Sequence, residues 1–159
     1  MTTRRNIVFD SWPVMAYLQG EPPVKRIIEI IADAHERGDS LLMSVINAGE
    51  VWYSIASRSN PDTADGAIEL VQSLGIEFIE VDWPTTQIAA RYKARGGISY
   101  ADCFSAALTK ISSSPPARGG VAPASGDEVV GAGRGGGSVL LTGDREFKQL
   151  EKEIDIVWL

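Results

Sequence analysis

Short apolar runs alternate along the chain with longer segments in which apolar residues recur at helical spacing, and this alternation limits the folds that the chain can adopt. Strands that alternate with helices favour an α/β fold, in which helices cover both faces of a mostly parallel sheet. In such sheets ligands bind beyond the carboxyl ends of the strands, so functional side chains are expected just after each strand. We expect strands over Ile7–Phe9, Leu41–Val45, Ile76–Val81, Val139–Thr142 and Ile156–Trp158.

The segments between these strands carry the start and stop signals of helices. Ser, Asp, Asn and Pro stand where helices are expected to begin, and Gly follows several of the expected helix ends. In particular, Asn47 is expected to cap the helix that follows the second strand. The expected helices lie between Ser11 and Gly20, between Pro22 and Gly38, over Ala48–Arg58, between Asn60 and Gly75, between Asp82 and Gly96, over Ser99–Ile111 and over Asp144–Glu151.

One stretch, Ser112 to Ser138, interrupts this pattern within what we expect to be a single domain of residues 1–159. It is rich in Gly, Ser, Ala and Pro and holds few large apolar residues, so it is predicted to be a flexible insert. It contains Gly131-x-Gly133-x-x-Gly136, which has the spacing of a dinucleotide-binding motif. That interpretation is rejected, because the motif must join a strand to a helix and this one precedes a strand.

The chain carries 21 acidic and 15 basic residues, for a formal net charge of -6. This sign is unfavourable for a protein that holds nucleic acid through a broad basic face. A nuclease of this composition would need its acids gathered around divalent cations, which reverse the local charge. A structural zinc site is not expected, because the chain has one cysteine and one histidine.

No apolar run approaches the roughly 20 residues that are needed to cross a bilayer. The apolar segment before Asp10 is too short for the apolar region of a signal peptide. The single cysteine, Cys103, cannot form an internal disulfide, which suits a reducing compartment. We therefore expect a cytoplasmic protein with no membrane partner.

Carboxylates stand where a parallel sheet would gather them. Asp10 follows the first expected strand and Asp144 follows the fourth. Glu50 lies one turn into the helix after the second strand, and Asp102 lies in the first turn of the helix that begins at Ser99. Close together, such carboxylates would raise one another's pKa values unless a cation lay between them. Oxygen ligands without His or Cys favour Mg²⁺ or Mn²⁺.

Each of these acids also has a simpler explanation as a helix cap. Acids at helix N-termini accept hydrogen bonds from free N–H groups and complement the helix dipole. Ser99 with Asp102, and Asn47 with Glu50, have the spacing of a capping box. Asp82 also ends a strand and precedes a helix, so position alone leaves five candidate acids.

Four segments resemble the four motifs of PIN domains and occur in the family's order. They are residues 7–11 (IVFDS), 46–51 (INAGEV), 99–108 (SYADCFSAAL) and 140–147 (LLTGDREF). The likeness is closest to VapC-type toxins of bacterial and archaeal toxin–antitoxin pairs, and it covers nearly the whole chain outside 112–138. PIN domains usually connect the last two motifs briefly, so the long insert departs from the family pattern.

The resemblance implies a three-layer fold with a twisted, mostly parallel sheet of about five strands flanked by helices. It also selects among the candidate acids and gives Asp82 no role in the site. It implies a catalytic metal site of four acids, with three polar neighbours that help to orient the carboxylates or a water molecule. The acids are Asp10, Glu50, Asp102 and Asp144, and the supporting residues are Ser11, Asn47 and Thr142.

The activity that the resemblance implies is hydrolysis of RNA phosphodiester bonds with Mg²⁺ or Mn²⁺ as cofactor. The implied partners are RNA, a second copy of the chain in a homodimer, and a cognate antitoxin that covers the acidic groove. Two alternatives stay open, a non-catalytic PIN-like binding scaffold and a housekeeping PIN nuclease without an antitoxin. A haloacid-dehalogenase-like phosphotransferase would need a second Asp two residues after Asp10, where Trp12 stands. We expect Trp12 itself to pack in the core.

Overall fold

Five parallel strands form the centre of the structure, a computed structural model that describes residues 3–113 and 137–159. The strand order across the sheet is β3-β2-β1-β4-β5. The predicted α/β fold with a parallel five-stranded sheet is therefore confirmed. The strands are β1 (Asn6–Phe9), β2 (Ser40–Ser44), β3 (Ile76–Ile79), β4 (Ser138–Thr142) and β5 (Asp155–Trp158).

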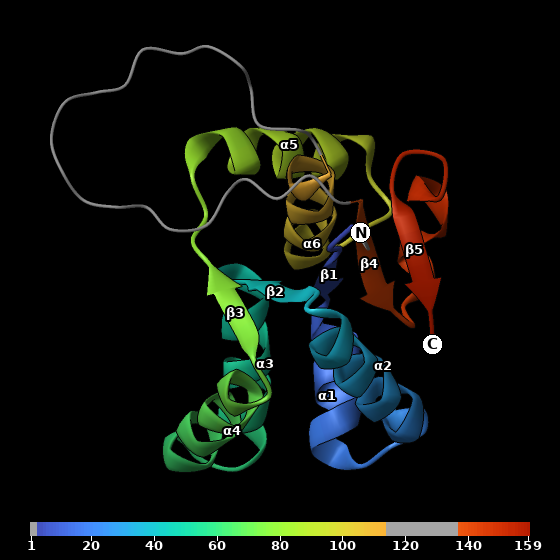
Figure 1. Ribbon diagram of the computed structural model, residues 1–159. Helices are drawn as coiled ribbons and strands as arrows, with labels where there is room; N and C mark the ends of the chain where they lie inside the picture. Colours follow the sequence, from blue (N-terminus) through green and yellow to red (C-terminus); the bar gives the residue numbers. More distant parts are fainter. Residues whose placement is uncertain (1–2, 114–136) are drawn as a thin grey trace, which may run out of the picture.

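Helices cover both faces of this sheet, so the described part of the chain has three layers. Figure 1 shows α1 to α4 on one side of the strands and α5 with α6 on the other side. None of the helices that the structure describes is long and apolar enough to cross a membrane. The helices are α1 (Ser11–Gln19), α2 (Val24–Arg37), α3 (Val45–Arg58), α4 (Pro61–Ser73), α5 (Trp83–Arg95) and α6 (Tyr100–Ser112), with the short 3-10 helix η1 (Arg145–Leu150).

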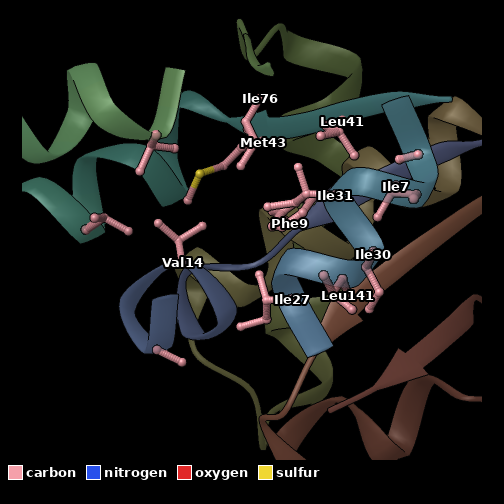
Figure 2. Close-up of a cluster of buried hydrophobic side chains, with 14 of the residues drawn as sticks. Ile7, Phe9, Val14, Ile27, Ile30, Ile31, Leu41, Met43, Ile76 and Leu141 are labelled. Atoms are coloured by element: carbon pink, nitrogen blue, oxygen red, sulfur yellow. The ribbon is translucent and has the colours of Figure 1, made fainter. Parts of the chain in front are cut away.

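Two apolar cores lie on the two faces of the sheet, because alternate side chains of a strand point to opposite faces. In β1, Phe9 packs into the core under α1 to α4, whereas Val8 packs into the core under α5 and α6. Figure 2 shows the first of these cores, where Phe9, Met43 and Ile31 come together from β1, β2 and α2. Burial of each such side chain stabilises the fold by about 2 kcal/mol.

The chain reverses direction across the sheet next to β1. From β1 it moves to β2 and β3, and it then returns to the other side of β1 to form β4 and β5. Right-handed crossovers in opposite directions place their helices on opposite faces, which accounts for the two helical layers. The carboxyl ends of β1 and β4 therefore flank a switch point, the usual place of a binding site in parallel sheets.

The start of α3 differs from the prediction. The strand was expected to reach Val45 and the helix to begin at Ala48 with Asn47 as its cap, but α3 begins at Val45 and Ser44 is the cap. The Ser44 hydroxyl accepts a hydrogen bond from the backbone N–H of Asn47, at 3.2 Å. Asn47 thus lies in the first helical turn with a fully buried side chain. The prediction of Asn47 as a cap is wrong, because Ser44 takes that position and the Asn47 amide is buried against α6 instead.

Other boundaries also differ. The third strand ends at Ile79 and not at Val81, and the expected helix at Asp144–Glu151 is a 3-10 helix. Asp144 still caps that short helix, since its carboxylate accepts a hydrogen bond from the backbone N–H of Glu146 at 2.9 Å. The α6 and β4 boundaries, in contrast, extend into the stretch that was predicted to be an insert.

The predicted flexible insert 112–138 is described only at its ends. Ser112 is the last residue of α6 and Ser138 the first of β4, so these two residues belong to regular elements. The Asn6 side-chain amide donates to the Ser112 carbonyl at 3.3 Å and to the Ser138 hydroxyl at 3.2 Å. Residues 114–136, which include the Gly-rich motif, lie outside the described part of the chain.

Candidate metal centre

Asp10 lies at the carboxyl end of β1 and caps the N-terminus of α1. Its side chain is almost completely buried, at 1% exposure. The Ser105 hydroxyl donates to Oδ1 at 3.2 Å, and the Thr142 hydroxyl donates to Oδ2 at 3.0 Å. Burial raises the pKa of Asp10, and these hydrogen bonds oppose that rise. The two hydroxyl donors, from α6 and β4, hold the carboxylate in one orientation.

Asp102 meets Asp10 from the first turn of α6. Ser99 begins this helix, and its hydroxyl accepts a hydrogen bond from the Asp102 N–H at 3.1 Å. The Asp102 carboxyl group lies close enough to that of Asp10 for their charges to interact. Burial and then the negative charge of Asp10 raise the pKa of Asp102 to about 8. Near neutral pH Asp102 thus keeps its proton in the metal-free protein, and a bound cation would replace that proton.

Asp144 and Glu146 complete an acidic group on the solvent side of this pair. The Asp144 N–H donates to the Thr142 hydroxyl at 3.0 Å, which ties the turn after β4 to the residue that also holds Asp10. One carboxylate oxygen from each of Asp102, Asp144 and Glu146 lies within 4.8 Å of the others. Asp144 is half-buried and Glu146 is exposed, so the group opens to solvent on their side.

Glu50 joins the centre through α1. The Ser11 hydroxyl donates to Glu50 Oε2 at 2.5 Å, which links the Glu50 carboxylate to the residue that follows Asp10. The buried Asn47 amide donates to the Ala101 carbonyl at 3.0 Å and so connects α3 with α6. Among the residues that the structure describes, the close acidic group consists of Asp102, Asp144 and Glu146 and does not include Glu50. Glu50 is connected to Asp10 only through its hydrogen bond with the neighbouring residue Ser11.

The structure thus brings the four predicted acids to neighbouring positions at the carboxyl edge of the sheet. Among the described residues, Asp82 makes no contact with them. Asp82 caps α5, where it accepts hydrogen bonds from the Thr85 N–H at 2.9 Å and the Thr85 hydroxyl at 2.5 Å. These bonds lower the pKa of Asp82. The capping explanation is sufficient for Asp82, whereas Asp10 and Asp144 cap helices and also belong to the centre.

Glu146 is a residue of the centre that the sequence analysis did not single out. Its Oε2 accepts a hydrogen bond from the Ser99 N–H at 3.0 Å. In a capping box this bond is made by the residue three positions after the cap, which here is Asp102. Because Glu146 supplies it from another element, the Asp102 carboxyl group can face Asp10. No local spacing could have revealed this, since Glu146 lies 47 residues from Ser99.

The donor atoms of the centre fit a hard divalent cation. The acidic group offers only carboxylate oxygens, which suit Mg²⁺ or Mn²⁺ better than zinc. Cys103 follows Asp102, but it is fully buried and burial raises the pKa of its thiol to about 11, so it stays protonated. His35 is occupied elsewhere, where its Nε2 lies 2.8 Å from the Leu74 carbonyl.

Comparisons with known proteins identify the family and the fold. A model of the PIN domain family matches residues 7–153. A chain of VapBC2 from Rickettsia felis, bound to a DNA fragment from its promoter, superposes with a TM-score of 0.64 at 11% identity, covering 96% of this chain and 97% of that chain. DNA-bound VapBC from Salmonella typhimurium gives a TM-score of 0.61 at 16% identity, covering 96% of both chains.

A third similar structure is VapC20 from Mycobacterium tuberculosis, described as a toxin that cleaves the sarcin–ricin loop. It gives a TM-score of 0.53 at 17% identity and covers 65% of this chain and 81% of that chain. At these identities the structural likeness establishes the fold. A search of the curated proteins found no match.

Proposed function

The chain belongs to the PIN domain family, and on that basis we propose that it is an Mg²⁺- or Mn²⁺-dependent endoribonuclease that acts as the toxin of a toxin–antitoxin pair. The observation that carries the proposal is the buried Asp10–Asp102 pair with Asp144 and Glu146 beside it. Crowded carboxylates of this kind are unfavourable without a cation. They stand at the switch point of a parallel sheet, where such folds bind ligands.

We assign the cation to Asp10, Asp102 and Asp144, which would hold one or two ions directly or through water, with Glu146 as a further candidate ligand. When bound, the cation would neutralise charge on the phosphate oxygens and lower the pKa of water at the scissile bond. Glu50 would position the cation or the attacking water. The carboxylate of Glu50 is a suitable acceptor for this role, since the Ser11 hydroxyl holds only one of its two oxygens at 2.5 Å.

Three polar residues would keep these carboxylates in place. Thr142 donates to Asp10 and accepts from the Asp144 N–H, so one hydroxyl orients two of the proposed ligands. Ser11 orients Glu50, and Asn47 connects the helices that carry Glu50 and Asp102. Such outer contacts hold metal ligands in the geometry that binding requires.

We further propose a cytoplasmic homodimer whose acidic groove is covered by an antitoxin. The support comes from the VapBC structures that share the fold. Two large apolar side chains on α3, Ile46 at 39% and Tyr53 at 57% exposure, stand on the helix that also carries Glu50. Ile46 and Tyr53 are seven residues apart and so lie on one face of α3, which we propose as part of the surface that the partner covers.

The test of the nuclease is RNA cleavage by the purified chain with Mg²⁺, with and without EDTA. The wild-type chain should cut RNA only with the metal, Asp10→Asn and Asp102→Asn should be inactive but folded, and Asp82→Asn should match the wild type. Cleavage by either site variant at the parental rate would refute the assignment. Binding of Mn²⁺ in calorimetry without cleavage of any RNA tested would favour the non-catalytic scaffold.

The toxin role needs a separate test in cells. Expression of the chain alone should arrest growth, and co-expression of the protein encoded by the adjacent reading frame should restore it. Asp102→Asn, as the matched control, should not arrest growth. If the chain cleaves RNA but does not arrest growth, and no partner is encoded beside it, the result would favour the housekeeping nuclease.

A further inference from the structure

Gly143 stands between Thr142 and Asp144, and its lack of a side chain has one evident cause. A Cβ atom on Gly143 would lie 2.5, 2.6 and 2.8 Å from three carbon atoms of the Trp12 ring. Carbon atoms make favourable contact only near 3.5 to 4.0 Å, so the ring already occupies this space. Gly143 is not among the glycines with positive φ, so its backbone conformation does not itself require glycine. The requirement comes from Trp12.

Trp12 is not a core residue, contrary to the expectation from the sequence. Its side chain is 37% exposed, and part of its ring covers the Gly143 backbone. Its backbone N–H faces Asp10 Oδ2 at 3.5 Å. The residue therefore belongs to the first turn of α1 and reaches the turn after β4, two residues from one proposed ligand and next to another.

These contacts join the start of α1, which carries Asp10, to the 142–144 turn, which carries Asp144. Asp10 Oδ2 accepts from the Thr142 hydroxyl, and that hydroxyl accepts from the Asp144 N–H. Trp12 follows Asp10 by two residues, and its ring packs against Gly143 in the same turn. The turn that carries Asp144 is thus joined to the start of α1 by a polar contact through Thr142 and by an apolar contact through Trp12, and backbone N–H groups of Phe147 and Leu159 also bind it.

We propose that Trp12 is a positioning residue of the metal centre, whose ring on Gly143 holds the 142–144 turn so that Asp144 faces Asp102. This inference rests on the proposed function, because it concerns the same centre. Without the ring, the turn keeps its hydrogen bonds to Thr142 and within η1 but loses the apolar contact that fixes Gly143, so Asp144 can shift relative to Asp102. The affinity for the cation then falls, although none of the proposed ligands has changed.

The experiment is a double-mutant cycle read by Mn²⁺ affinity, with calorimetry on the purified full chain. Trp12→Ala should lower the affinity about tenfold, as expected for the loss of a contact behind a ligand. Trp12→Phe, which keeps a smaller ring, should recover part of it. Gly143→Ala should lower the affinity because its methyl group displaces the ring. In the Trp12→Ala background, Gly143→Ala should have no further effect, since the ring is gone.

The unfolding midpoint of each variant in EDTA separates positioning from plain stability. A merely structural contact would change the midpoint and leave the Mn²⁺ affinity of the folded protein unchanged, which would overturn the inference. So would additive effects of Trp12→Ala and Gly143→Ala. Trp83→Ala is the matched control, since Trp83 also lies in the first turn of a helix capped by an Asp and is 68% exposed. It should bind Mn²⁺ like the wild type.

Two failures can be told apart. If the wild-type chain binds no Mn²⁺, the proposed function fails and this inference fails with it. If the wild type binds Mn²⁺ and Trp12→Ala binds it equally well, only the positioning role is refuted. If Gly143→Ala does not fold, the difference between Trp12→Ala and Trp12→Phe decides the question.

Discussion

Asp102→Asn is expected to stabilise the metal-free protein while it removes the proposed activity. Burial and the charge of Asp10 raise the pKa of Asp102 from its ordinary value of 3.8 to about 8. Between these values the folded protein binds a proton that the unfolded chain does not. The folded state therefore loses stability as the pH rises from about 4 to about 8, and the full contribution is present only below that window.

The size of the effect follows from the width of this window. Neutral pH lies roughly three units above the ordinary pKa, and each unit corresponds to about 1.4 kcal/mol, which bounds the cost at about 4 kcal/mol. The centre opens to solvent beside Asp144 and Glu146, and screening there reduces the cost to about 2 kcal/mol. Asn has the same shape, does not ionise and can donate to Asp10. The variant should thus unfold about 4 to 8 °C higher than the wild type.

The assay is thermal unfolding in EDTA at pH 5 and pH 8. The unfolding midpoint of the wild type should be lower at pH 8 than at pH 5. The midpoint of Asp102→Asn should decrease less over the same pH range. Added Mg²⁺ should raise the midpoint of the wild type and not that of the variant. Asp82→Asn is a control that should instead lower the unfolding midpoint, because the pKa of Asp82 is lowered and its carboxylate stabilises the fold. An Asp102→Asn protein less stable than the wild type at pH 8 in EDTA would refute the reasoning.

Three further substitutions test separate contacts. Thr142→Val removes the hydroxyl that serves Asp10, and it should cost about 2 kcal/mol of unfolding free energy and weaken Mn²⁺ binding; Thr142→Ser should retain both, and an equal loss in the two variants would contradict this role. Asp82→Ala should cost about 1 kcal/mol, measured by urea unfolding, and leave RNA cleavage unchanged; slower cleavage would place Asp82 in the site. Gly75→Ala, at φ 83° and with its new Cβ 2.6 Å from His35 Cε1, should cost more than about 1 kcal/mol in the same assay. Adding His35→Ala should recover part of that loss, and no recovery would assign the whole cost to the backbone.

The order and type of most elements could be predicted because each is marked locally. Ile7–Phe9 is a short apolar run that ends at a polar residue, and it corresponds to β1. The start of α3 could not be predicted in the same way, because Ser44 and Asn47 are both good caps. The choice depends on a distant contact, the hydrogen bond from Asn47 to the Ala101 carbonyl, which requires a buried amide.

In the candidate site, too, some residues could be predicted from local motifs and others depend on distant contacts. Asp10, Asp102 and Asp144 could be proposed because motifs surround them, and position excluded none of the competing acids. Glu146 lies inside the fourth motif, yet its contact with the centre depends on how η1 packs against α6. The contact of Trp12 with Gly143 is equally remote in sequence. Sequence patterns report local geometry, and both of these contacts are made by the tertiary fold.

The pair of hydrogen bonds made by Asn6 has a consequence for how this chain can vary. One amide at the start of β1 binds the last residue of α6 and the first residue of β4, and so brings the two ends of the 112–138 connection to the same point. Once the ends of a loop are held together, each doubling of its length costs only about 0.6 kcal/mol in closure entropy. The position of Asp144 relative to Asp102 therefore does not depend on how many residues connect α6 to β4. Insertions and deletions at this point can accumulate while the carboxylates keep their places.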